Sequence, residues 1–216
     1  GLAGVAVLAM CAARGMRLRF SLRDHALLAL QGSFMYGVSY LCVYHAEKHI
    51  VSGLVAVGYS ASPLVTGLGA QALFGLRVSA RFVIGGLLGL LGVALMFWTE
   101  FGKAAGTHDA ALGALFTVGS VLLSSVGSLT ASRNRAHGLP FWPAMGYGML
   151  YGSVVAAVFA LLMGHSFALP LVASWWVSLF YLSLAGSVLT FACFLTLQER
   201  IGPGPTGTIG VMTPLL

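Results

Sequence analysis

Long apolar runs separated by short charged corners set the pattern along the chain. A run of about 20 apolar residues can cross the bilayer core as an α-helix, and a helix satisfies its own backbone hydrogen bonds where water is absent. The runs that are long enough for this are 26–46, 51–74, 82–99, 111–131, 141–163 and 174–197. Shorter apolar runs, 1–13 and 205–216, flank the set. The pattern predicts an all-α, polytopic membrane helix bundle with six complete spans and two partial ones.

The composition indicates that the lipid bilayer is the solvent of this chain. Hydrophobic residues make up 58% of the 216 positions and charged residues only 7%, whereas an ordinary soluble domain is about 25% charged. The formal net charge is +6, but the basic residues are spread over several corners without interleaved aromatic residues. Membrane topology explains this distribution better than nucleic-acid binding does. We therefore expect a multi-pass membrane protein whose partner is the lipid bilayer and not nucleic acid.

The basic residues alternate between the two sides of the predicted bundle. Lys48 and Lys103 lie on one side, and the other nine of the 11 Lys and Arg residues lie in four alternate loops. Those four loops are 14–25, 77–81, 132–140 and 198–204. Because cytoplasmic loops carry an excess of Lys and Arg, the four loops are predicted to be cytoplasmic.

Two stretches of the chain resemble each other at a constant interval of 151 residues. "CVYHAEKHIVSGLVAVGYSASPLV" (42–65) aligns without gaps with "CFLTLQERIGPGPTGTIGVMTPLL" (193–216), and the shared positions include a cysteine, an isoleucine, a glycine and a proline. The predicted topology sends the helix before the first stretch outward and the helix before the second stretch inward. The pattern therefore indicates inverted repeats, which build many secondary transporters and place the substrate site near the bilayer midplane.

The chain resembles the EamA-type bacterial exporters of the drug/metabolite transporter superfamily. The resemblance is carried by "LCVYHAEKHIVSGLVAVGYSASPLVTGLGAQALFGLRVSARFVIGGLLGLLGVALMF" (41–97), "SLTASRNRAHGLP" (128–140) and "FACFLTLQERIGPGPTGTIGVMTPLL" (191–216). It implies an inner-membrane protein with two inverted repeats of five plus five helices, in which helices 1, 3, 4, 6, 8 and 9 line a central cavity. On this basis residues 1–101 would hold part of helix 2 to helix 5, and residues 111–216 would hold helix 6 to part of helix 9. The chain would then be incomplete at both ends.

A stripe of tyrosines on the 26–46 helix predicts one wall of a cavity. Gly32, Tyr36, Tyr40 and Tyr44 recur every four residues, and at 100° per residue they fall within a stripe about 120° wide. Phenols offer flat contact area and a hydroxyl that orients a ligand. The alternative is a helix–helix seam, with Tyr44 near the outer aromatic belt. The complete candidate set for substrate binding is Tyr36, Tyr40, Tyr59, Ser62, Ser124 and Phe191.

The remaining members of that set come from three other predicted helices. Ser62 and Ser124 are the small polar residues best suited to face a substrate, although helix packing explains such residues as well. Phe191 aligns with Tyr40 in the internal repeat. Pro63, next to Ser62, removes a backbone hydrogen bond and is expected to kink its helix.

Groups for catalysis, metal binding or ion coupling are missing from the pattern. No complete span carries Asp, Glu, Lys or Arg near its centre, which leaves proton coupling through a midplane carboxylate unsupported. Cys11, Cys42 and Cys193 lie inside apolar runs and are expected to be small core residues. "GPGPTG" (202–207) has the form of a glycine-rich nucleotide loop, but its two prolines remove backbone donors and no βαβ unit surrounds it. We expect no enzyme activity, no cofactor and no metal.

The expected function is export of small metabolites by alternating access. Amino acids, drug-like compounds and other uncharged or zwitterionic molecules fit the family resemblance and the tyrosine-rich wall. Two alternatives stay open: a carrier for anionic metabolites of the same superfamily, and a non-transporting membrane protein. Besides its small-molecule substrate and the bilayer, a second copy of the chain in a homodimer is considered as a partner.

Overall fold

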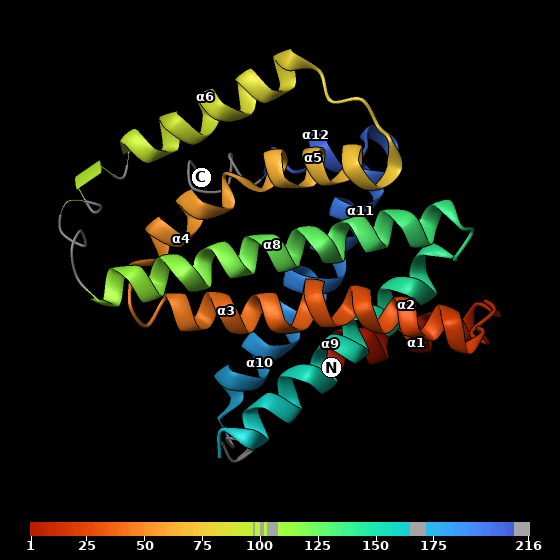
Figure 1. The fold of residues 1–216 in the computed structure, drawn as a ribbon. Helices are drawn as coiled ribbons and strands as arrows, with labels where there is room; N and C mark the ends of the chain where they lie inside the picture. Colours follow the sequence, from red (N-terminus) through yellow and green to blue (C-terminus); the bar gives the residue numbers. More distant parts are fainter. Residues whose placement is uncertain (97, 100–101, 103–107, 165–171, 210–216) are drawn as a thin grey trace.

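The computed structural model describes residues 1–96, 98–99, 102, 108–164 and 172–209. Within these residues the chain is helical and contains no β-strand. Figure 1 shows the resulting bundle of helices, two of which include a π-helical segment that we call η1 and η2. In chain order the elements are α1 (Leu2–Ala13), α2 (Leu22–Gly32), η1 (Ser33–Val38), α3 (Ser39–Ala46), α4 (Ser52–Tyr59), α5 (Ser62–Phe74), α6 (Ala80–Met96), α8 (His108–Ala136), α9 (Phe141–Leu162), α10 (Ala173–Tyr181), η2 (Leu182–Leu189), α11 (Thr190–Ile201) and α12 (Pro203–Thr206).

Five helical stretches are apolar and long enough to cross a membrane. They are Leu22–Ala46, Ser52–Phe74, His108–Ala136, Phe141–Leu162 and Ala173–Ile201. Five of the six predicted complete spans are thereby confirmed, and α1 matches the predicted partial span at the start of the chain. Many large apolar side chains on these helices are exposed, which fits helices that are surrounded by lipid.

The predicted span 82–99 is the exception. Helix α6 covers 17 described residues, at the lower limit of the roughly 17–25 residues of a transmembrane helix. Position 97 lies outside the described residues, as do positions 210–216 of the predicted partial span at the end of the chain. Within the part of the chain that the structure describes, length and composition therefore support five complete spans, not six.

The span Ser52–Phe74 is interrupted where the sequence predicts a kink. Helix α4 ends at Tyr59 and α5 begins at Ser62, with Pro63 in its first turn. Proline has no amide hydrogen to donate, so it is accepted in a first turn but breaks the hydrogen-bond ladder of a continuous helix. The expected kink is confirmed as a break between two helices.

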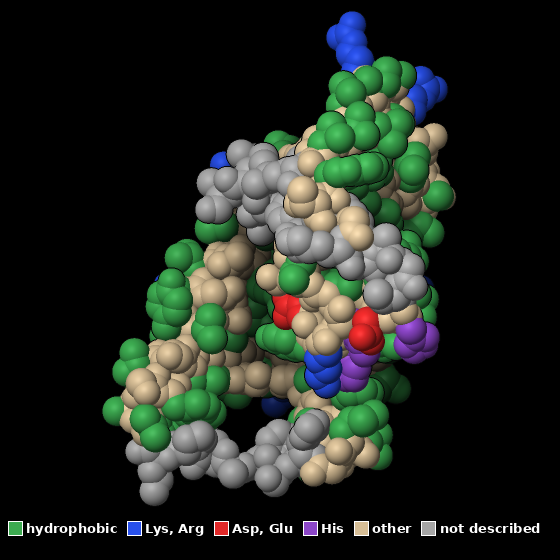
Figure 2. Space-filling model, turned by 90° about the vertical axis from the view of Figure 1, so that its left-hand side faces the viewer, with side chains coloured by type: hydrophobic (Ala, Val, Ile, Leu, Met, Phe, Trp, Pro, Cys, Tyr) green, Lys and Arg blue, Asp and Glu red, His purple; other side chains and the backbone are tan. Residues whose placement is uncertain are grey.

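The basic corners of the chain lie at one end of the bundle, which we call the arginine-rich end. Figure 1 shows the α1–α2, α5–α6 and α8–α9 corners on the same, right-hand side. An ion pair between Arg135 and Glu199 adds the end of α11 to them. Figure 2 shows the opposite end, where a small group of acidic, basic and histidine side chains lies between hydrophobic flanks. At that end the ring of His49 donates to the Asp109 carboxylate at 2.9 Å and joins the α3–α4 corner to α8.

Glycines allow α9 to pack closely against α1 and α2. A Cβ placed on Gly4 of α1 would lie 2.9 Å from the carbonyl oxygen of Gly146, and one placed on Gly32 of α2 would collide with the backbone of Gly148. Small residues permit this kind of approach between membrane helices. Gly32 therefore belongs to a helix–helix seam and not to a cavity wall, and Tyr44 of the same stripe is 62% exposed.

Helix boundaries recur at the interval found in the sequence. Three helix starts and the ends of the two π-helical segments are each separated by 151 residues: Leu22 and Ala173, Ser39 and Thr190, Ser52 and Pro203, Val38 and Leu189. A repeat in local chain geometry thus accompanies the similarity between 42–65 and 193–216.

Candidate functional site

Two membrane spans change from α-helical to π-helical geometry near their middles. Segment η1 interrupts the span Leu22–Ala46, and η2 interrupts the span Ala173–Ile201. The hydroxyls of Ser187 and Thr190 donate to the carbonyl oxygens five residues earlier, which matches the wider turn of a π-helix. Because π-helical segments often occur at functional sites, the side chains beside them are the first candidates for function.

Tyr36 of η1 and Phe191, two residues after η2, lie against each other. Their ring centroids are 4.7 Å apart with the planes at 84°, the edge-to-face arrangement that aromatic pairs favour. The Tyr36 hydroxyl is buried and has no hydrogen-bond partner among the described residues. A buried hydroxyl is costly unless a polar group reaches it. The structure therefore joins two predicted site residues and leaves a hydroxyl available where they meet.

A second group of predicted residues surrounds the hydroxyl of Tyr59 on α4. The Tyr59 hydroxyl donates to the Ser120 hydroxyl at 2.5 Å, and Ser120 donates to the carbonyl oxygen of Ser39 at 3.0 Å. Ser124, one turn further along α8, interacts with the same phenol. These bonds connect α4, α8 and α3 inside the bundle.

Tyr40 links the two groups, whereas Ser62 stands apart from them. Tyr40 is 42% exposed, but it is close enough to Tyr36 and Tyr59 for the phenols to interact electrostatically. The hydrogen bond described for Ser62 uses its backbone carbonyl, which accepts from the hydroxyl of Thr66. All predicted site residues except Ser62 thus lie in one group. We call this group the tyrosine cluster: Tyr36, Tyr40, Tyr59, Ser124 and Phe191.

The hydrogen bond of Tyr59 gives a first testable prediction. Tyr59→Phe is expected to lower the stability of the detergent-solubilised protein by about 1 kcal/mol, because Ser120 loses its partner. Tyr44→Phe is the matched control, since Tyr44 is exposed, and it is expected to unfold at the wild-type temperature. Thermal unfolding of both variants and of Ser120→Ala measures the effect. In the double variant, a loss of stability equal to the sum of the losses in Tyr59→Phe and Ser120→Ala would show that the two hydroxyls do not interact.

Buried amide side chains form another polar group at the arginine-rich end. Asn134 of α8 donates to the side-chain carbonyl of Gln31 on α2 at 2.9 Å. Gln198 of α11 donates to the Ser132 hydroxyl at 2.6 Å and to the Ser128 carbonyl at 2.8 Å, and accepts from the Ser128 hydroxyl at 3.0 Å. The three amides are each at most 4% exposed. This amide cluster (Gln31, Ser128, Ser132, Asn134, Gln198) joins α8 to both α2 and α11.

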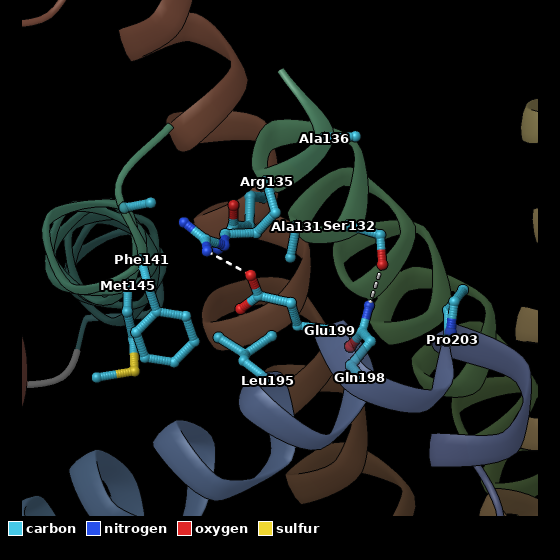
Figure 3. A pocket seen from close by; sticks show the side chains of 13 residues that line it. Ala131, Ser132, Arg135, Ala136, Phe141, Met145, Leu195, Gln198, Glu199 and Pro203 are labelled. Atoms are coloured by element: carbon cyan, nitrogen blue, oxygen red, sulfur yellow. Dashed lines mark hydrogen bonds and ion pairs between the residues drawn. The ribbon is translucent and has the colours of Figure 1, made fainter. Parts of the chain in front are cut away.

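A cavity of about 330 Å³ adjoins the amide cluster, and we call it the Arg135 cavity. Figure 3 shows Arg135 and Glu199 facing each other, with Phe141, Met145 and Leu195 on the neighbouring side. The nitrogen and oxygen atoms of this ion pair are 2.5 Å apart. Its walls come from α2, α8, α9, α11 and the start of α12. The volume and the mixed lining are those of a small-molecule site.

The sequence pattern alone does not single out the amide cluster. Gln31, Asn134 and Gln198 carry no charge, and a single amide interrupts an apolar run only slightly. The signal that could reveal them is physical: an amide within a membrane helix needs a hydrogen-bond partner on another helix. Their partners lie 66 to 103 residues away in the chain, so the pairing emerges only in the folded bundle.

The cysteines differ in their surroundings. Cys11 is buried as expected for a core residue, Cys42 is half-buried, and Cys193 is exposed. The expectation of a core position is therefore wrong for Cys193. Among the described residues, no group of three or more His, Cys, Asp or Glu side chains could hold a metal ion.

The described residues form a helical fold in which five stretches are long and apolar enough to cross a membrane, which is consistent with a multi-pass membrane protein. No protein-family model matches the chain, and no curated protein matches it. A solved structure, described only as the crystal structure of a protein, has a similar fold, with a TM-score of 0.77 and 20% sequence identity. The match covers 99% of this chain and 71% of that chain. At this identity the likeness shows a common fold, and a common fold does not establish a function.

Proposed function

We propose that this chain belongs to an EamA-type exporter of the drug/metabolite transporter superfamily in the bacterial inner membrane. Residues 1–101 and 111–216 form its two inverted repeats of five plus five helices, and the arginine-rich end faces the cytoplasm. The protein exports small uncharged or zwitterionic metabolites by alternating access. The observation that carries the proposal is the contact between Tyr36 and Phe191, beside two π-helical segments that end 151 residues apart.

The position and chemistry of the tyrosine cluster support this function. Secondary transporters place their substrate sites near the bilayer midplane, where corresponding elements of the two repeats meet. The cluster offers aromatic faces and hydroxyl groups and no formal charge. Such a surface suits a ligand with an apolar body and a few polar groups. An anion carrier needs cationic groups at its substrate site, whereas no residue of the tyrosine cluster carries a charge, so we prefer the uncharged or zwitterionic class.

Flux measurements test the proposal. The purified protein in proteoliposomes is expected to give saturable transport of at least one radiolabelled compound from a panel of amino acids and lipophilic drugs. Tyr36→Ala is expected to reduce that flux about tenfold or more, because it removes both the contact with Phe191 and the unpartnered hydroxyl. Tyr181→Ala is the control, because Tyr181 is 67% exposed, and its flux is expected to stay at the wild-type level.

Two outcomes would contradict this assignment. Absence of saturable flux for every compound on the panel would refute the exporter. Equal flux in Tyr36→Ala and Tyr181→Ala would refute a substrate site at the tyrosine cluster.

A further inference from the structure

The Arg135 cavity combines a charged rim with an apolar floor. Figure 3 shows the Glu199 carboxylate turned toward Arg135, with Leu195 and Met145 on the neighbouring side. Its volume of about 330 Å³ lies near the lower end of the roughly 300–1,000 Å³ that small-molecule sites occupy. A ligand that fills it is therefore small and has both charged and apolar parts.

The guanidinium of Arg135 is held in place by three contacts, and its Nε–H donor has no partner among the residues that the structure describes. Its guanidinium donates to Glu199 at 2.5 Å and to the Leu139 carbonyl at 2.7 Å, and its central carbon lies 5.7 Å from the centre of the Phe141 ring. The Nε atom is buried and has no hydrogen-bond partner in the described part of the chain. Because a guanidinium binds a carboxylate through two parallel hydrogen bonds, Arg135 can accommodate a ligand carboxylate.

Glu199 is held less firmly than Arg135. The contact described for its carboxylate is the one with Arg135, and its side chain is 46% exposed. Exposed ion pairs contribute little to stability. Exchanging this pair for contacts with a ligand therefore costs the protein little, and the freed carboxylate can receive a cationic group.

Gln31 offers a fixed polar group on the α2 side of the cavity. Its side chain is 2% exposed, and Asn134 occupies its carbonyl oxygen. Among the residues that the structure describes, its NH₂ group has no hydrogen-bond partner. This group is therefore available to a ligand in the cavity. Gln198, by contrast, uses its amide hydrogens on Ser128 and Ser132 and serves to hold the wall.

We infer that the Arg135 cavity binds a small zwitterion with an apolar side chain, of the class of neutral aliphatic α-amino acids. The ligand carboxylate contacts Arg135 and the amide of Gln31, its ammonium group contacts Glu199, and its side chain lies on Met145 and Leu195. A simple anion or cation leaves one member of the Arg135–Glu199 pair without a counter-ion, whereas a zwitterion satisfies both. The inference rests on the proposed function, because it makes this cavity the cytoplasmic entry stage of the export route.

Binding measurements with three related probes test the inference. L-Leucine carries both charges, isoamylamine lacks the carboxylate, and isocaproate lacks the ammonium group. Radiolabelled L-leucine is expected to bind the purified protein in lipid nanodiscs, and the two analogues are expected to compete at least about tenfold more weakly. These measurements need no transport.

Two charge-neutralising variants assign the two ends of the ligand. Glu199→Gln is expected to weaken L-leucine binding about tenfold and to leave isocaproate competition unchanged or stronger, because Arg135 loses its competing carboxylate. Arg135→Gln is expected to abolish isocaproate competition and to retain that of isoamylamine. Glu47→Gln, exposed at the opposite end, and Arg133→Gln, two residues before Arg135, are the matched controls and are expected to bind like the wild type.

The outcomes separate this inference from the exporter proposal. No L-leucine binding to the wild-type protein would overturn the inference, and so would an equal loss of all three probes in Glu199→Gln with an unchanged unfolding temperature. Saturable flux of other compounds without L-leucine binding would refute the inference and leave the exporter standing. Binding with the expected variant pattern but no flux of any compound would support the site and refute the exporter.

Discussion

Gly32→Ala is expected to destabilise the bundle by about 3 kcal/mol, the largest effect we expect from adding a single methyl group. The new Cβ would collide with the backbone of Gly148, and backbone cannot turn aside as a flexible side chain can. The same close approach is found from the α9 side of the helix crossing, because a Cβ on Gly152 would lie 2.7 Å from the carbonyl oxygen of Gly32. The helices α2 and α9 would have to separate.

Gly85→Ala is the matched control for this prediction. It makes the same substitution inside helix α6, where no described atom from another helix lies within 4 Å of the new Cβ. Alanine is a better helix former than glycine by up to about 1 kcal/mol, so this variant is expected to unfold at or above the wild-type temperature. Size-exclusion chromatography after heating measures both proteins. Equal unfolding temperatures for the two variants would show that α2 and α9 do not approach closely.

Gln198→Leu is expected to have the second largest effect on stability, about 2 kcal/mol. The substitution keeps a side chain of similar size but leaves the buried Ser128 hydroxyl and carbonyl and the hydroxyl of Ser132 without their amide partner. Gln71→Leu is the control, since Gln71 lies exposed on α5. Thermal unfolding in the same detergent compares the two. If Gln198→Leu proved as stable as Gln71→Leu, the amide cluster would not hold α11 to α8.

The membrane spans could be predicted because their physical requirement is simple. A helix that crosses lipid must be about 20 apolar residues long, and such runs are visible without any knowledge of their neighbours. The break before Pro63 could be predicted from the sequence for a similar reason, because proline acts on the backbone of its own helix. The length of α6 was harder to predict from the sequence, because helix ends depend on contacts and caps that a hydropathy pattern does not contain.

The candidate site was predictable only in part, because its geometry departs from the ideal helix. The stripe from Gly32 to Tyr44 assumes 100° per residue, whereas η1 widens the turn and changes the faces of the residues that follow it. Tyr36 meets Phe191 and, like Gly32, also packs against the glycines of α9, whereas Tyr40 and Tyr44 further along the stripe are exposed. The Arg135–Glu199 pair was equally hidden, because its members lie 64 residues apart in the chain.

The amide cluster also determines where the helices can move. It ties α2, α8 and α11 together at the arginine-rich end, and pulling them apart there would leave Gln31 and Gln198 unpaired in apolar surroundings. The least costly relative motion is therefore a tilt about this tie, in which the three helices diverge mainly at the far end. Glu199 and Arg135 line the cavity beside this tie, so the ligand that we infer there would need only side chains to move aside.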